Sequence, residues 1–231
     1  MIKACLFDLD GTLLNTLASI RYYVNKNVSK YGIEGITEAE TKVFVGKGAR
    51  VLIENVFKAR GLDLGEKKTQ ELCDRIHGEY VKDYDSAFSY LTEPYEGICD
   101  AVKTLEAMGM KLAVISNKPD LTVKALTEKF FGNGFSVVEG ASDRMPLKPR
   151  AEWPLDICKR LGVAPSEVMY VGDTSTDMQT AVNFGAGIKV GVRWGFRDER
   201  ELWDSGADFV ISYANELVRI ALGENDKEKC D

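Results

Sequence analysis

The chain has 231 residues, of which 45% are hydrophobic and 29% charged, a balance typical of a globular protein with a sizeable core. Its net charge of -6 argues against a nucleic-acid partner, which would require a basic surface, and no segment approaches the roughly 18 apolar residues of a membrane span. Five scattered cysteines without metal-type spacing, together with an N-terminus that lacks a secretory pattern, favour a cytoplasmic protein with reduced thiols.

A buried strand is expected at residues 2–7, where a short apolar run opens the chain. It leads directly into Asp8 and Asp10, which flank a leucine and precede Gly11 and Thr12. Residues i and i+2 of an extended backbone point to the same side, so the two carboxylates should lie together. Such a pair repels itself unless a cation lies between the groups or one of them holds a proton. Because open α/β sheets bind ligands at this end of their strands, we interpret the pair as half of a metal site that contains a nucleophile.

Two other structures can begin with the pattern Asp-x-Asp-Gly. An EF-hand calcium loop requires an acidic ligand at its fifth position and a glutamate at its twelfth. Counted from Asp8, these positions hold Thr12 and Ser19, so the EF-hand is excluded. An ordinary Asx turn remains as the alternative for this segment taken alone.

Residues 15–92 are expected to form an all-helical block, because their apolar residues recur with the period of a helix. The first helix should follow a cap at Asn15 or Thr16 and stop near Gly32. Further helical signals are a capping box at 37–40 and apolar stripes over about 48–59 and 66–84.

From Pro94 onward the pattern alternates between helices and strands. Strands are predicted at 111–116, 136–138, 168–171, 188–192 and 209–211. The intervening helices are predicted around 98–109, from near 119, and over 151–161, 175–184 and 213–222. Such alternation implies an α/β fold, with a Rossmann-like parallel sheet core covered by helices on both faces. The predicted domains are therefore a core of residues 1–14 and 93–231 and an inserted helical domain of residues 15–92.

Further polar side chains follow two of the predicted strands. Ser116 and Asn117 end the strand at 111–116, just before a helix whose N-terminal N–H groups and dipole favour an anion. A simple helix cap is equally compatible with these two residues. Asp173 and Asp177 follow the strand at 168–171 at a helix start, where acidic residues are ordinarily favourable.

With Asp8 and Asp10, these acids bring four carboxylates to one edge of the predicted sheet. A cluster of oxygen ligands without histidine or paired cysteines suits a hard cation such as Mg²⁺. The only histidine, His77, lies in a helical stretch far from every motif, so a histidine-based mechanism has nothing to use.

Two further segments have both a functional and a plain interpretation. Lys148 lies in a loop between two site segments, although a loop lysine is most often a solvated surface charge. Gly46, Lys47 and Arg50 combine flexible glycine with two cations, as in a substrate-reading loop, but the segment taken alone favours a plain connection between helices.

Taken together, these segments resemble the haloacid dehalogenase-like superfamily of phosphotransferases. The motifs match in order and spacing at Asp8–Thr12, at Ser116–Asn117, at Lys148–Pro149 and at Gly172–Asp173 with Asp177. The helical insert is similar to the mobile cap found in one branch of that superfamily. The phosphoglycolate phosphatase-like branch is favoured by the segments 46–48, 94–97, 116–119 and 192–197. The chain departs from that branch at Asn15, where an aspartate is usual, and at Arg150–Ala151, where Lys-Pro-x-Pro is usual.

The resemblance implies a Mg²⁺-dependent hydrolase of small phosphomonoesters such as 2-phosphoglycolate, a monomer or homodimer. Asp8 would attack phosphorus and form an aspartyl-phosphate, and Asp10 would act as general acid and base. The metal site would comprise Asp8, the backbone carbonyl of Asp10, Asp173 and, through water, Asp177. The implied phosphate-binding residues are Gly11, Thr12, Ser116, Asn117 and Lys148, and the implied substrate contacts of the cap are Gly46, Lys47 and Arg50.

Several alternatives stay open within this resemblance. The same fold serves sugar-phosphate mutases, pyrophosphatases, nucleotidases and dehalogenases; Asp10 disfavours a dehalogenase, since a halide needs no proton. A phosphoryl-accepting signalling module also phosphorylates an aspartate beside Mg²⁺, but the helical insert and the order of the first motif argue against it. An inactive scaffold is disfavoured because every catalytic position is filled.

Overall fold

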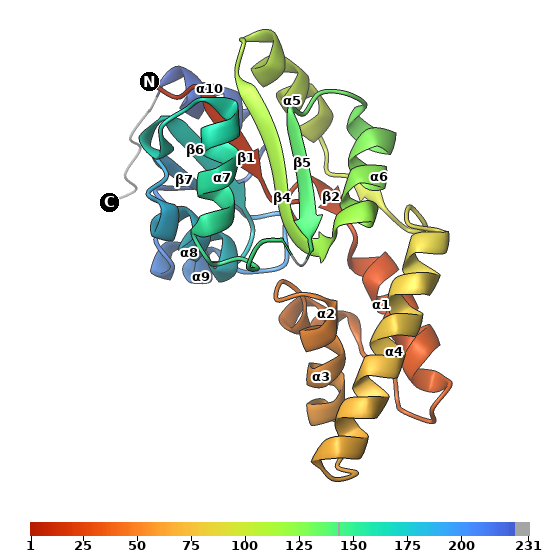
Figure 1. Ribbon diagram of the computed structural model, residues 1–231. Helices are drawn as coiled ribbons and strands as arrows, with labels where there is room; N and C mark the ends of the chain where they lie inside the picture. The colour runs from red at the N-terminus through yellow and green to blue at the C-terminus, as the bar shows by residue number, and fades with distance from the viewer. Residues whose placement is uncertain (143, 225–231) are drawn as a thin grey trace.

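The computed structural model describes residues 1–142 and 144–224, and it contains a central parallel sheet (Figure 1). Its six strands lie in the order β5-β4-β1-β6-β7-β8, and every neighbouring pair is parallel. The bounds are Ala4–Phe7 (β1), Lys111–Pro119 (β4), Val137–Ala141 (β5), Val168–Gly172 (β6), Ile188–Val192 (β7) and Phe209–Ile211 (β8). The predicted α/β fold with a parallel sheet is confirmed.

Helices cover both faces of the sheet, and the alternation of side chains along β1 shows why. Cys5 and Phe7 point into one apolar cluster, while Ala4 and Leu6 point into another, and all four are fully buried. The first cluster is completed by α5 (Ile98–Ala107), α6 (Asp120–Phe131) and α10 (Glu216–Leu222). The second cluster is completed by α7 (Glu152–Leu161) and α8 (Ser175–Phe184). A sheet buried on both sides leaves only its strand ends open to a ligand.

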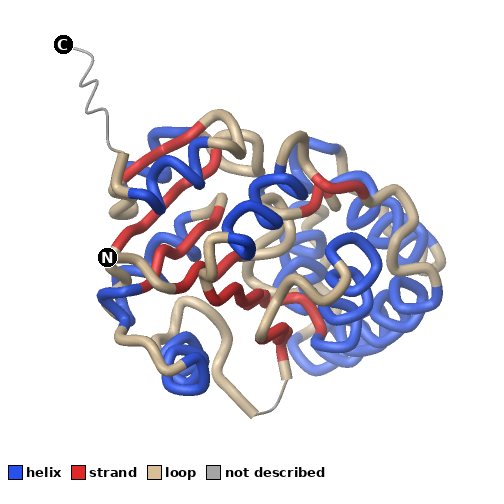
Figure 2. The backbone as a smooth tube through the Cα atoms, turned by 90° about the horizontal axis from the view of Figure 1, so that it is seen from above, coloured by secondary structure: helices blue, strands red, loops and turns tan. Residues whose placement is uncertain are grey.

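Four helices between β1 and β4 form a separate bundle with its own apolar cluster, here called the α1–α4 unit. They are α1 (Leu17–Ser29), α2 (Glu38–Phe44), α3 (Ala49–Ala59) and α4 (Glu66–Ser86). Figure 1 shows the unit beyond the arrowheads of β4 and β5, and Figure 2 shows its helices gathered on one side of the sheet. The division of the chain into domains at 15–92 stays a prediction, but the unit lies where the strands end.

Side chains of the core also hold the α1–α4 unit directly. Arg197, in the loop after β7, donates to the carbonyl oxygens of Lys42, Val43 and Val45 at the end of α2. These carbonyls have no partner within the helix, and the negative end of the helix dipole favours a cation there. Asn117 donates to the carbonyl of Gly46, 3.1 Å away.

The sequence missed some elements and misplaced others. The strand predicted at 111–116 continues to Pro119, and the one predicted at 136–138 occupies Val137–Ala141. Helix α9 (Glu199–Asp204) and the antiparallel pair β2 (Leu14–Asn15) and β3 (Glu93–Pro94) were not predicted, because such short elements show no periodicity. The capping box at 37–40 is confirmed. In the described parts of the chain, no helix is long and apolar enough to cross a bilayer.

Candidate active site

Three buried carboxylates meet at the carboxyl ends of β1 and β6, which are neighbouring strands. Asp8 follows β1, Asp173 follows β6, and Asp177 lies in the first turn of α8. One oxygen of each lies within 4.8 Å of the others, and the residues are 7%, 0% and 0% exposed. Oxygen ligands at this spacing can surround a divalent cation.

Three glycines give these acids the space that they occupy. A Cβ atom on Gly11 would lie 2.2 Å from Asp173 Oδ2, and one on Gly195 would lie 2.2 Å from Asp173 Cβ. A Cβ atom on Gly172 would likewise lie 2.2 Å from the Cβ of Asp177. Side chains at these positions would displace the acids, so the close approach of the backbone is part of the site. Gly11 in addition has a φ of +86°, which glycine adopts without strain.

Hydrogen bonds fix the orientation of Asp173 and Asp177. The Thr12 hydroxyl donates to Asp173 Oδ1 at 3.1 Å, and the backbone N–H of Phe196 donates to Asp173 Oδ2 at 2.8 Å. Asp177 accepts from both the N–H and the hydroxyl of Thr174, at 3.1 and 2.6 Å, in a capping box at the start of α8. The acids are therefore held in place before any ligand arrives.

Lys148 is a member of this buried cluster. Its Nζ lies 2.9 Å from Asp8 Oδ1 and 2.7 Å from Asp177 Oδ1, and only 2% of its side chain is exposed. A buried ammonium requires such partners, since burial without them would strongly favour its neutral form. The plain interpretation of Lys148 as a solvated surface charge is therefore wrong.

The cluster carries more negative charge than its own cation neutralises. Burial and the charge of Asp177 raise the pKa of Asp8 to about 7, although Lys148 opposes this rise. Burial and the charges of Asp177 and Asp8 also hold the pKa of Asp173 well above its usual range. Three carboxylates face one ammonium, and a bound cation would favour the charged form of each acid.

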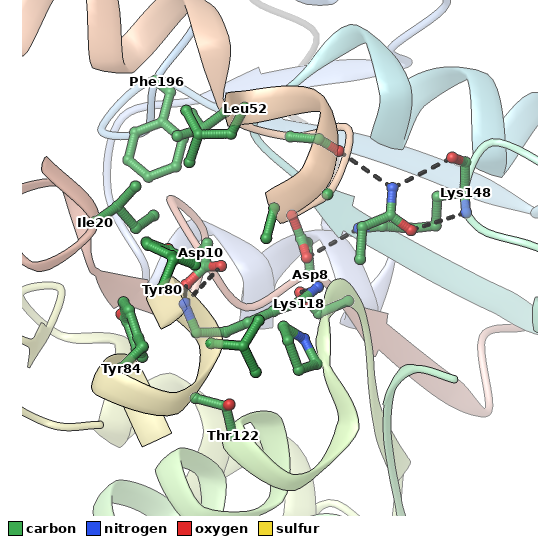
Figure 3. A pocket seen from close by; sticks show the side chains of 18 of the residues that line it. Asp8, Asp10, Ile20, Leu52, Tyr80, Tyr84, Lys118, Thr122, Lys148 and Phe196 are labelled. Carbon is green, nitrogen blue, oxygen red and sulfur yellow. Dashed lines mark hydrogen bonds and ion pairs between the residues drawn. The ribbon is translucent and has the colours of Figure 1, made fainter. Parts of the chain in front are cut away.

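The carboxylate of Asp10 does not join this cluster. Strand β1 ends at Phe7, so the alternation that would align Asp8 with Asp10 does not extend to them. Both oxygens of Asp10 lie instead 3.2 Å from Nζ of Lys118, on the side of the α1–α4 unit (Figure 3). The four converging carboxylates expected from the sequence are three in the structure, and Lys118 was a partner that the sequence did not reveal.

Ser116 and Asn117 lie at the same edge, and both are buried. The Ser116 hydroxyl accepts from the N–H of Lys118 at 3.3 Å. The Asn117 amide accepts from the N–H of Lys148 at 2.9 Å and donates to the carbonyls of Lys148 and Gly46. Asn117 therefore ties the loops of Lys148 and Gly46 to the end of β4.

A pocket opens between this edge and the α1–α4 unit, whose side of it is mainly apolar (Figure 3). The unit contributes Ile20, Val45, Leu52, Tyr80, Val81 and Tyr84, and the core adds Phe196. Of the three predicted substrate contacts of the helical unit, Gly46 lines the pocket. Lys47 is exposed and is not part of the lining, and Arg50 pairs with Glu54 and Asp74 away from it.

The motif residues that follow β1 lie within a longer segment that matches a known protein family. Residues 5–192 match the family model of haloacid dehalogenase-like hydrolases. The chain belongs to this family. Across 220 residues the hydrolase is 28% identical to a phosphoglycolate phosphatase of Haemophilus influenzae, covering 93% of this chain and 96% of that one. Across 234 residues it is also 28% identical to the N-acetylmuramic acid 6-phosphate phosphatase of Pseudomonas aeruginosa, covering 100% and 97%.

A crystal structure from Lactobacillus delbrueckii subsp. bulgaricus, described as a candidate phosphoglycolate phosphatase, superposes with a TM-score of 0.86. The two sequences are 30% identical, over 96% of this chain and 98% of that one. The hydrolase is accordingly a phosphatase of the phosphoglycolate phosphatase-like branch, as its motifs predicted.

Proposed function

We propose that this phosphatase is a Mg²⁺-dependent hydrolase of small phosphomonoesters that acts through an aspartyl-phosphate on Asp8. The observation that carries the proposal is the buried group of Asp8, Asp173 and Asp177, with Lys148 beside it. These oxygen ligands fit Mg²⁺, which would reduce the repulsion between the Asp8 carboxylate and an anionic phosphate.

Asp8 is the proposed nucleophile. Its Oδ1 accepts from the N–H of Leu9 at 2.7 Å and from Lys148 at 2.9 Å, which fixes the carboxylate and leaves the attack on phosphorus to the other oxygen. The new bond joins this oxygen to phosphorus while the ester P–O bond breaks. Lys148, Ser116 and the N–H groups near Gly11 would stabilise the charge of the transferred group.

Asp10 is the proposed general acid and base. Its carboxylate lines the pocket outside the acidic group and pairs with Lys118 on the side of the α1–α4 unit, where a leaving group would be. Asp10 would give its proton to the leaving alkoxide and then take one from the water that hydrolyses the aspartyl-phosphate. This hydrolysis releases inorganic phosphate and regenerates the free Asp8 carboxylate.

We infer that the α1–α4 unit acts as a cap that excludes water and shapes the leaving-group side of the pocket. Its apolar lining supports this role, because electrostatic interactions with the transferred phosphoryl group are stronger where water is excluded. The resemblance to the Haemophilus enzyme favours 2-phosphoglycolate as the substrate. The equal resemblance to the Pseudomonas enzyme supports N-acetylmuramic acid 6-phosphate as a second candidate.

The decisive experiment combines metal removal with replacement of the nucleophile. EDTA should abolish phosphate release from p-nitrophenyl phosphate and both candidate substrates, and Mg²⁺ should restore it. Rapidly quenched wild-type protein should carry phosphate on the peptide that contains Asp8, and Asp8→Asn should show neither phosphate nor turnover. Full activity of Asp8→Asn would refute the nucleophile, and metal-independent turnover would refute the proposed cation.

A further inference from the structure

Lys118 is a buried cation of the pocket lining that pairs with Asp10, and it follows Ser116 and Asn117 in the chain. The residue is 8% exposed, and its Nζ lies at the same distance, 3.2 Å, from both carboxylate oxygens of Asp10. Burial disfavours the charged form of Lys118, but the Asp10 carboxylate outweighs this and raises the pKa of the lysine, so the side chain is an ammonium.

The α1–α4 unit supplies the second partner of Lys118. Nζ lies 4.1 Å from the centre of the Tyr84 ring in α4, within the range of a cation–π contact (Figure 3). Tyr84 is itself 2% exposed and packs against Tyr80 and Tyr23, with ring centres 5.7 and 4.9 Å away. Lys118 therefore links an acid of the core to a buried, packed aromatic group of the helical unit.

Other charged groups at the pocket have partners of their own. Lys148 bridges Asp8 and Asp177, and Asp85 accepts from the hydroxyl of Thr122. Lys118 is thus the cation that pairs with the Asp10 carboxylate. An ammonium donates to a carboxyl in either protonation state, since a protonated carboxyl keeps an acceptor oxygen.

We propose that Lys118 is a positioning residue, which holds the Asp10 carboxyl away from the buried acids and towards the leaving group, and that Tyr84 makes this position depend on the α1–α4 unit. The proposal rests on the proposed function, because it takes Asp10 to be the general acid and base. Without Lys118, Asp10 loses its ion-pair partner, and proton transfer to the leaving oxygen becomes poor.

The test compares leaving groups that differ in their need for a proton. An alkoxide leaves poorly unless it is protonated, whereas p-nitrophenolate is stable as an anion. Replacement of Lys118 by Met should lower kcat for 2-hydroxyethyl phosphate by about 10²-fold. The loss of kcat for p-nitrophenyl phosphate should be about tenfold at most. The variant Lys118→Gln should show the same pattern, and Lys124→Met, an exposed lysine of α6, should leave the ratio of the two rates unchanged.

Two further comparisons tie the effect to Asp10 and to the helical unit. Asp10→Asn should show the same leaving-group dependence, and adding Lys118→Met to it should change kcat little, since the two residues act as one. Tyr84→Leu should reproduce part of the effect, whereas Tyr84→Phe, which keeps the ring, should not. Circular dichroism of each variant establishes that it is folded.

The outcomes separate this inference from the proposed function. Equal losses with both leaving groups in Lys118→Met and Lys118→Gln would overturn the positioning role while Asp10→Asn still upheld the general acid. A loss confined to 2-phosphoglycolate, with 2-hydroxyethyl phosphate unaffected, would overturn it in favour of a lysine that binds the substrate carboxylate. If Asp10→Asn itself showed no dependence on the leaving group, the proposed function would fail at that residue.

Discussion

The two sides of the pocket are built in different ways. On the core side, three carboxylates and an ammonium are buried together, and three glycines leave no room for a Cβ atom. On the side of the α1–α4 unit the lining is mainly apolar and aromatic. Outside that lining, the exposed Gly78 of α4 has nothing within 4 Å of the place of a Cβ atom. The comparison shows where the molecule tolerates change: the core packs its charges against backbone that leaves no space for a side chain, whereas the helical unit supplies an apolar wall.

The largest expected effect comes from adding a methyl group to the core, compared with adding one to an exposed position of the helical unit. Gly195→Ala places a Cβ against Asp173, so we expect about a 10²-fold loss of Mg²⁺ affinity and of kcat/KM. Gly78→Ala, in an exposed helical position, should retain activity and raise the free energy of unfolding by about 0.5–1 kcal/mol. Metal titration and thermal unfolding of both variants measure these effects. Equal activity of the two variants would mean that the core side is not the more constrained one.

The contact between the two regions gives the next prediction. Arg197→Met removes the hydrogen bonds to the carbonyls at the end of α2, and bonds of a charged group are worth about 1.5–3 kcal/mol. We expect faster amide exchange over residues 42–48 and a loss of kcat/KM of about tenfold, because the helical unit is held less firmly. Arg193→Met is the matched control, since Arg193 is exposed and pairs with Glu199 within the core. Unchanged exchange in Arg197→Met would show that other contacts hold the unit.

The crowded charges of the core also predict a smaller effect on stability. Because the pKa of Asp8 is raised from 3.8 to about 7, the folded metal-free protein loses stability as pH rises through this interval, where the unfolded chain has already released the proton. Asp8→Asn keeps the acceptor oxygen and escapes this cost, so with EDTA we expect it to be more stable by on the order of 1 kcal/mol, or about 3 °C in Tm.

That advantage of Asp8→Asn has a defined dependence on pH and metal. It should be absent below about pH 4, reach its full size above about pH 7, and shrink when Mg²⁺ binds and stabilises the wild type. Thermal unfolding with EDTA and with Mg²⁺ checks it. An advantage that instead grew as pH fell would show that the carboxylate stabilises the fold.

The smallest effect is expected at Arg50, on the helical side. Its guanidinium pairs with Glu54 and Asp74 outside the pocket, so Arg50→Ala should change kcat/KM for phosphomonoesters by less than about twofold. Steady-state kinetics on 2-phosphoglycolate and p-nitrophenyl phosphate measure it. A loss of kcat/KM for 2-phosphoglycolate alone would support the original prediction that Arg50 contacts the substrate.

The strands and most helices were predictable because their signals are local. An apolar run such as residues 2–7, or a capping box such as 37–40, depends only on neighbours along the chain. The elements that were missed, α9 and the β2–β3 pair, are too short to show a period. The acids after β1 and β6 could be located because the ends of parallel strands meet at one edge.

The sequence by itself determined the alternating α/β core, the helical insert and the acidic segments at the strand ends, since each follows from the order of residues along one stretch of chain. Only the tertiary structure decided which charges meet: that Lys148 bridges Asp8 and Asp177, and that Asp10 turns to Lys118. The physical reason is that ion pairs and close packing join residues more than 100 positions apart, such as Asp10 and Lys118, and no local pattern records which partner a buried charge will find.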